Sequence, residues 1–137
     1  MLAQNFLTSA DLGISQAHID ALILTLGVLE RGEIVHLYDP DDAGYIHQSS
    51  PLYFNMATWA DTEGCSTVAC IGGTAELLGG VNFSDTYVGV KTPEVIALDD
   101  LFYPSPEYDS HSIIVSQAAT ALRNYLTTGK ARWEEIL

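Results

Sequence analysis

Two cysteines are the residues of this sequence best placed to do chemistry. Cys65 and Cys70 lie in the segment Trp59-Ala-Asp-Thr-Glu-Gly-Cys-Ser-Thr-Val-Ala-Cys-Ile-Gly-Gly73. We predict a helix that begins at about Ser66, which puts Cys65 at or just before the helix N-terminus. Unpaired backbone amides and the helix dipole lower the pKa of a thiol in that position and make it a better nucleophile. Cys65 is therefore a candidate nucleophile for an acyl or amide substrate.

A cysteine nucleophile needs a histidine base within hydrogen-bond reach, and the base must be oriented by a third group. The candidate bases are His36, His47 and His111. His111 comes first because Asp109, two residues upstream, is a candidate orienting group, with Asn55 as a second one. The enzyme hypothesis thus combines Cys65 as nucleophile, His111 as base and Asp109 or Asn55 as orienter.

The same segment also fits a purely structural role. Free cysteines are among the most buried residues and behave as small hydrophobic side chains. Together with Ala69, Gly72 and Gly73 they would form a surface of small residues against which another helix packs closely. The carboxylates of Asp61 and Glu63 would oppose formation of a thiolate by like-charge repulsion.

No metal or cofactor is expected. The C-x4-C spacing is that of neither a zinc ribbon nor a thioredoxin-like site. If both cysteines were helical, their side chains would point about 140° apart at 3.6 residues per turn, so they could not share a metal ion. The acidic turn at Asp39-Pro-Asp-Asp-Ala-Gly44 superficially resembles a calcium loop, but Ala43 and Ser50 stand at two ligand positions.

The charge of the sequence is strongly negative. Its 18 Asp and Glu residues against 5 Lys and Arg give a formal net charge of −13. Direct binding to nucleic acid needs a basic stripe, so this composition argues against it. The negative charge either favours binding of a basic protein partner or only keeps the protein soluble. A protein that mimics nucleic acid is a special case, and its candidate carboxylates are Asp39, Asp41, Asp42, Asp99, Asp100, Glu107 and Asp109.

Length and hydropathy indicate one globular domain over residues 1–137. Apolar residues make up 47% of the chain and charged residues 17%, which is far from the composition of a disordered chain. The N-terminus has no signal-peptide pattern, and no run approaches the ~20 apolar residues that span a bilayer. We therefore expect a cytoplasmic protein without a membrane segment. The sequence does not predict its oligomeric state.

Periodicity and capping signals predict a mainly α fold, with α+β as the alternative. The expected helices run from Gln16 to about Arg31, capped by Ser15 and ended by Gly32; from about Ser66 to Leu78; from Pro93 to Leu101; and from about Ser116 to Gly129. Trp133, Ile136 and Leu137 are expected to fold back onto the core. The result is a compact bundle of three to four helices, with short extended segments at 33–38, 52–59 and 81–90 and long loops.

A longer part of the sequence resembles a group of small uncharacterised proteins from bacteria and their phages. The shared features, in order, are Phe54-Asn-Met56, Trp59, Cys65-Ser-Thr-Val-Ala-Cys-Ile-Gly-Gly73, Leu101-Phe-Tyr-Pro104, and a Ser-Gln-Ala-Ala helix that closes at Gly129 before Trp133. In that group the cysteine segment tends to read Cys-Gly-Thr-x-x-Cys-x-x-Gly-x-Ala. This sequence differs from it at Ser66, where the group has glycine, and at Thr74, where tryptophan is frequent. The resemblance covers most of the chain beyond Leu52 and implies no activity, but it favours an accessory or phage-associated role.

These observations lead to two hypotheses of different classes. The first is a non-enzymatic protein that binds a macromolecular partner through an acidic surface, because no catalytic constellation is complete in the sequence. The second is a thiol enzyme that uses Cys65.

Overall fold

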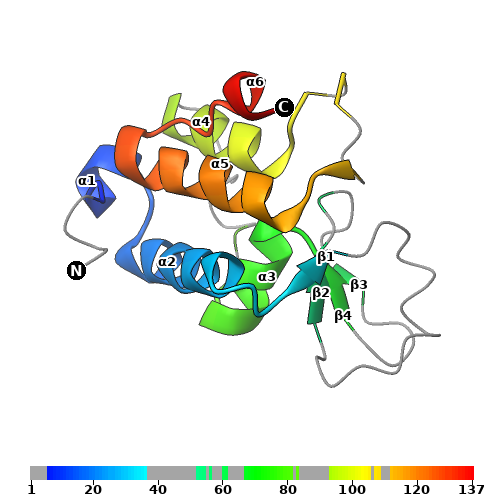
Figure 1. Cartoon of the computed structure of the whole chain (residues 1–137). Helices are drawn as coiled ribbons and strands as arrows, with labels where there is room; N and C mark the ends of the chain where they lie inside the picture. The colour runs from blue at the N-terminus through cyan, green and yellow to red at the C-terminus, as the bar shows by residue number, and fades with distance from the viewer. Residues whose placement is uncertain are drawn as a thin grey trace.

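The computed structural model describes residues 6–36, 52–54, 56, 60–61, 67–81, 83, 93–105, 107–108 and 112–137. In this part the chain forms α1 (Ser9–Leu12), α2 (Gln16–Glu30), β1 (Val35–His36), β2 (Leu52–Phe54), β3 (Ala60–Asp61), β4 (Thr67–Ala69), α3 (Ile71–Gly79), α4 (Pro93–Phe102), α5 (Val115–Thr128) and α6 (Trp133–Ile136). Helices dominate, which confirms the expected mainly α fold. The helices form one group with the small sheet at its end (Figure 1).

Helix α2 has the boundaries that its capping residues predict. The Ser15 hydroxyl accepts a hydrogen bond from the His18 backbone N–H at 3.3 Å, which satisfies an amide that has no partner within the helix. Just after the helix, Gly32 adopts the left-handed conformation with φ of +69°. The apolar side chains of the helix, Ile19, Leu22, Leu26 and Leu29, are buried.

Helix α5 begins two residues earlier than a cap at Ser116, the one that the Ser-Gln-Ala-Ala pattern predicts, would place it. The N-cap residue is Ile114, not Ser116, and the Gln117 side-chain oxygen accepts the Ile114 backbone N–H at 3.0 Å. Because the glutamine side chain reaches back over the first turn, no cap from a serine hydroxyl is needed. At its other end the helix closes on Gly129, with φ of +86°, as predicted.

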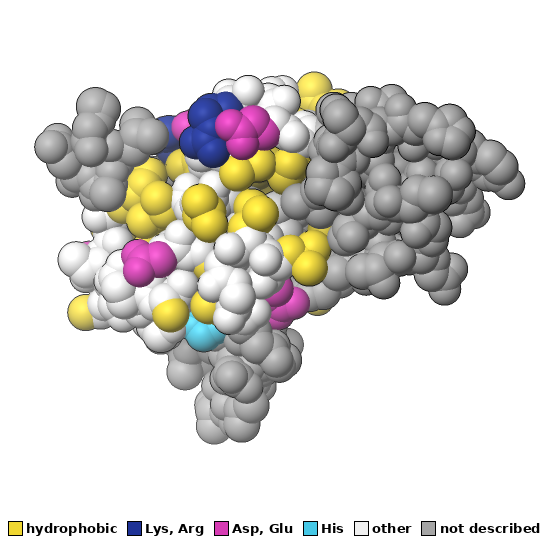
Figure 2. All heavy atoms as spheres, turned by 90° about the horizontal axis from the view of Figure 1, so that it is seen from below, with side chains coloured by type: hydrophobic (Ala, Val, Ile, Leu, Met, Phe, Trp, Pro, Cys, Tyr) yellow, Lys and Arg dark blue, Asp and Glu magenta, His cyan; other side chains and the backbone are white. Residues whose placement is uncertain are grey.

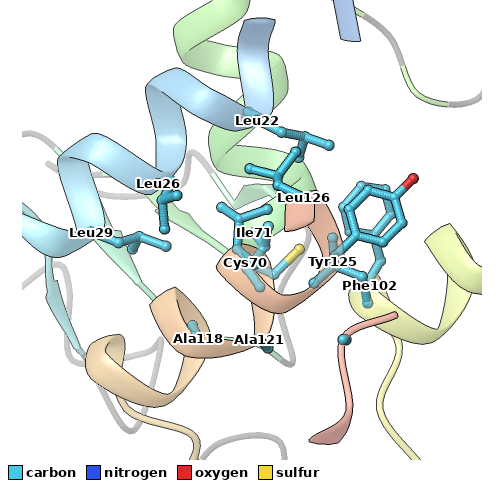
Figure 3. Close-up of a cluster of buried hydrophobic side chains, with 14 of the residues drawn as sticks. Leu22, Leu26, Leu29, Cys70, Ile71, Phe102, Ala118, Ala121, Tyr125 and Leu126 are labelled. Atoms are coloured by element: carbon cyan, nitrogen blue, oxygen red, sulfur yellow. The ribbon is translucent and has the colours of Figure 1, made fainter. Parts of the chain in front are cut away.

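The core lies where α2, α3, α4 and α5 meet. Helices α2 and α5 run side by side in opposite directions, and α6 lies close to α4 (Figure 1). Figure 3 shows the interior, in which leucines of α2 face the apolar side of α5. Its labelled residues are all buried: Leu22, Leu26, Leu29, Cys70, Ile71, Phe102, Ala118, Ala121, Tyr125 and Leu126.

The prediction of a helix from Ser66 is wrong at its start. Residues 67–69 form strand β4, and the helix begins only at Ile71. The strand pairs in parallel with β2, with Leu52 opposite Thr67 and Phe54 opposite Ala69. Thr67 and Val68 are β-branched residues, which fit a pleated strand better than a first helical turn.

The sheet has the strand order β1-β2-β4-β3. The first three strands of that order are parallel, and β3 is antiparallel to β4. Strands β1 and β2 fall within segments that we expected to be extended. The sheet ends against the N-terminus of α3, because β4 leads directly into that helix.

Helices α2 and α3 approach each other very closely at one point. A Cβ atom built on Gly79 would lie 2.3 Å from the Cβ of Ala21 and 3.0 Å from its Cα. The sequence suggested such a contact at Gly72 and Gly73, and these two residues are indeed buried. The close approach at Gly79 lies at the other end of the same helix.

Both ends of the described chain are attached to the helical core. Near the N-terminus, the Leu7 N–H donates to the Leu126 carbonyl at 2.7 Å. Near the C-terminus, Trp133 is buried, and its indole Nε1–H donates to the Asp100 carbonyl at 2.9 Å. The predicted return of the C-terminal segment is thereby confirmed for Trp133, whereas Leu137 stays exposed.

Candidate functional site

The junction between β4 and α3 places Cys70, and not Cys65, at the N-cap of a helix. Cys70 is the single residue between the strand and the helix. Its sulfur accepts a hydrogen bond from the Gly73 backbone N–H at 3.5 Å. Cys70 therefore has the position at the start of a helix that we expected for Cys65.

The environment of Cys70 suppresses its reactivity. The residue is only 2% exposed, and burial raises the pKa of its thiol to about 11 even though backbone N–H groups of the first turn favour the thiolate. Figure 3 shows the sulfur inside the apolar cluster, directed toward Tyr125. Since the thiolate is the nucleophilic form, the geometry supports packing rather than catalysis at Cys70.

We expect Cys70 to resist alkylation in the folded protein. At pH 8 a thiol with a pKa near 11 is ionised to about one part in a thousand, against roughly a quarter for a free cysteine. Iodoacetamide should therefore label Cys70 at least about 100-fold more slowly in the native chain than in urea, as followed by mass spectrometry. Native labelling of Cys70 within threefold of the unfolded rate would contradict its assignment as a structural thiol. Selective fast labelling of Cys65 in the same sample would support the thiol-enzyme hypothesis.

The structure does not describe the residues of the predicted catalytic group. Cys65, His111, Asp109, Asn55 and His47 all lie outside the described residues. For His36, only the backbone is described, as the last residue of β1. The Cys65 hypothesis thus stays a prediction.

One buried hydroxyl lies one turn beyond Cys70. Thr74 is fully buried, and its Oγ1 has no hydrogen-bond partner within the described part of the chain. Position 74 is therefore a core position in this chain.

Three carboxylates gather where the end of α4 meets α6. We call Asp99, Asp100 and Glu134 the α4–α6 acidic patch. Burial, and then the negative charges of Glu134 and Asp99, raise the pKa of the Asp100 carboxyl. Glu134 and Asp99 therefore lie close enough to Asp100 for their charges to act on its carboxyl. Asp100 and Glu134 are exposed, so the charge is presented to solvent.

Of the other carboxylates predicted for an acidic surface, the structure describes only Glu107. Glu107 lies in the segment after α4 and accepts a hydrogen bond from the Ser105 hydroxyl at 3.3 Å. Asp39, Asp41, Asp42 and Asp109 lie outside the described residues, so their alignment into a mimic of nucleic acid stays a prediction. The sequence did not single out Glu134, because its place beside Asp100 depends on how the C-terminal segment folds back.

Two arginines are held in ion pairs and do not form a basic surface. The Arg123 guanidinium binds both carboxylate oxygens of Glu30, at 2.6 and 2.8 Å. Arg31 binds Glu33 at 2.5 Å. On the face seen from below the molecule, basic side chains likewise lie directly beside acidic ones (Figure 2). These positive charges are locally neutralised.

A groove of about 640 Å³ lies between the C-terminal half of α2 and α5. Its apolar lining comes from Leu29, Ile34, Val115 and Ala119. The charged groups at its edge, Glu30 and Arg123, already bind each other. The groove therefore offers apolar surface but no unpaired charge with which to select a ligand.

Within the described residues, no three His, Cys, Asp or Glu side chains are grouped as metal ligands. No helix among them is long and apolar enough to cross a bilayer. Comparison of the chain with protein-family models, with curated proteins and with solved structures finds no match.

Proposed function

We propose that this chain is a non-enzymatic protein that binds a basic protein partner through its acidic surface. The observation that carries the proposal is that α6 lies against the end of α4, where the Trp133 indole donates to the Asp100 carbonyl, and that the negative charges of Glu134 and Asp99 help to raise the pKa of the Asp100 carboxyl. The charged neighbours that shift the pKa of Asp100 within the described residues are both acidic. The formal net charge of −13 supplies a long-range field of the same sign.

Mutual repulsion at the patch makes a positively charged partner favourable. The Asp100 carboxylate is held partly out of water and beside like charges, and both effects raise its free energy. A lysine or arginine of a partner would relieve that repulsion and would be steered toward the surface before contact. Direct binding of nucleic acid is not part of the proposal, because Arg31 and Arg123 are engaged in ion pairs.

We further propose that the protein acts in the cytoplasm as an accessory factor of bacteria or of their phages. The reduced, buried thiol of Cys70 fits a reducing compartment. The sequence resemblance supplies the accessory role.

The test is binding of a lysine-rich peptide to the full chain, measured by fluorescence anisotropy at low and physiological salt. We expect the cationic peptide to bind at low salt and to weaken as salt rises, because screening shortens the reach of the surface charge. A glutamate-rich peptide of the same length is the control and should not bind. Equal binding of both peptides, or of neither at low salt, would contradict the proposal.

A further inference from the structure

Helix α2 has a side that faces neither of the helices against which it packs. The helix contacts α3 and α5. On its remaining side, Leu24 is 45% exposed, and Ala17, Asp20 and Arg31 are exposed as well, with Gly27 half-buried among them. At about 100° per residue, these five positions fall within about 80° of the helix circumference. They form one line along the helix, which we call the α2 stripe.

The stripe carries one charge of each sign. The Arg31 side chain donates from Nε and Nη2 to Glu33, and its Nη1 lies over Gly27, 2.8 Å from the place of a Cβ atom there. Toward the other end of the stripe, the Asp20 carboxylate accepts a hydrogen bond from the Gln16 side chain at 2.9 Å. Exposed contacts of this kind contribute little to stability. Both charged groups therefore stay accessible to a second molecule.

The order of residues along the stripe is self-complementary. Leu24 follows Asp20 by four residues, and Gly27 precedes Arg31 by four residues, so the two pairs share one midpoint. A two-fold axis through that midpoint brings a second copy of the helix into antiparallel alignment with the first. Each Asp20 then lies opposite an Arg31, and each Leu24 lies opposite a Gly27.

We propose that the α2 stripe is the contact surface of a homodimer in which two copies of α2 pack antiparallel. Asp20 of the second copy pairs with Arg31 and draws the guanidinium away from Gly27. Leu24 of the second copy then packs over the glycine backbone. The small side of the helix at Ala17 and Gly27 lets the two helices approach closely, because the distance between packed helices depends on the side chains at the contact.

Charge complementarity favours a second copy at this surface. Two chains with a net charge of −13 repel each other at long range, so contact between them needs a face where opposite charges meet. The α2 stripe supplies an arginine opposite an aspartate twice, once at each end. The carboxylate of Glu30, next to the stripe, is bound by Arg123. Contact through the α4–α6 acidic patch would instead bring the carboxylates of both copies together, which is unfavourable.

Sedimentation velocity on the full chain at physiological salt tests the dimer. The contact between two single helices is small, so we expect reversible association over a range from about 5 to about 500 µM. The average mass should rise with concentration from 14.8 kDa toward twice that value. A monomer at every concentration would overturn the proposal. The proposed function would be unaffected, because it concerns a different surface.

Two charge reversals and their mixture test the pairing. Asp20→Arg puts an arginine opposite Arg31 of the second copy, and Arg31→Asp puts an aspartate opposite Asp20. Each variant alone should associate at least about tenfold more weakly than the parent chain. An equimolar mixture restores opposite charges at both ends and should recover association to within about threefold of the parent. A mixture that associates no better than the separate variants would overturn the antiparallel pairing.

Two packing variants test the contact of the leucine with the glycine. Gly27→Ala fills the space over the glycine, and in a single copy the new methyl group meets only the Arg31 side chain, which can move. Because alanine is the better helix former, this variant should unfold at higher urea concentration and yet associate about tenfold more weakly. Leu24→Ala should also weaken association about tenfold.

The matched control is Leu77→Ala on α3, where the leucine is 48% exposed. It should change association less than about twofold, because it lies outside the α2 stripe. Circular dichroism verifies that each variant is folded. A dimer that is insensitive to Leu24→Ala and Gly27→Ala, or that loses as much in Leu77→Ala, would overturn the α2 stripe as the contact surface.

Discussion

Truncation of Tyr125 to alanine is expected to lower the free energy of unfolding by about 3–5 kcal/mol, the largest effect of any single change discussed for this chain. Tyr125 is fully buried in the middle of the core, between α5 and the neighbouring helices (Figure 3). Removing its ring leaves a cavity that the surrounding leucines and Phe102 fill only in part. Urea denaturation followed by circular dichroism measures the change.

The matched variant is Tyr125→Phe, which removes only the hydroxyl. This hydroxyl is buried and has no hydrogen-bond partner within the described residues, and burial raises its pKa. An unpaired buried hydroxyl costs about 1–3 kcal/mol, so its removal should leave stability unchanged or increase it. A clear loss of stability in Tyr125→Phe would show that the hydroxyl makes a stabilising hydrogen bond.

Replacement of Gly79 by alanine is the second change with a large expected effect. Alanine is the better helix former by about 1 kcal/mol, so an unconstrained site would gain stability. Here the new methyl group would lie 2.3 Å from the Ala21 Cβ and 3.0 Å from the Ala21 backbone. Helices α2 and α3 must then separate, and we expect a net loss of about 1–3 kcal/mol in the free energy of unfolding.

Two controls isolate the steric cause of that loss. Ala21→Gly combined with Gly79→Ala exchanges the two side chains across the contact and should recover most of the stability of the parent chain. Gly80→Asn changes the neighbouring position, where φ is +65° and no atom lies within 4 Å of an added Cβ. Asparagine tolerates the left-handed conformation, so this variant should lose less than about 0.5 kcal/mol. Equal losses at both positions, or no rescue by the exchange, would contradict a close contact between the helices.

The helices with strong local signals could be predicted from the sequence. Ser15 and Gly32 marked the ends of α2, and Pro93 marked the start of α4. Such signals are local, because a cap or a proline acts on the backbone next to it. The cap of α5 was misplaced because the Gln117 side chain accepts the backbone N–H of Ile114 and so allows the helix to begin without a serine cap.

Strand β4 and the close helix contact could not be predicted in the same way. A strand of three residues is too short for an alternating pattern. Its parallel partner β2 lies 15 residues earlier in the sequence, with Leu52 opposite Thr67. A contact such as that of Gly79 with Ala21 depends on how two helices cross. Sequence patterns in each helix alone do not contain that information.

The acidic surface was predicted in part. The sequence singled out Asp99 and Asp100 by their charge, but it missed Glu134. We predicted a thiol at a helix N-terminus but placed it at Cys65, because we expected the helix to begin five residues before its actual start at Ile71.

The most direct test of the central claim is the salt dependence of binding between the full chain and the lysine-rich peptide. We expect the logarithm of the association constant to fall steadily as the logarithm of the salt concentration rises, and the slope to become shallower in the Asp99→Asn and Asp100→Asn double variant. An association constant that does not change with salt, or a slope that the double variant leaves unaltered, would contradict binding through the acidic surface of α4 and α6.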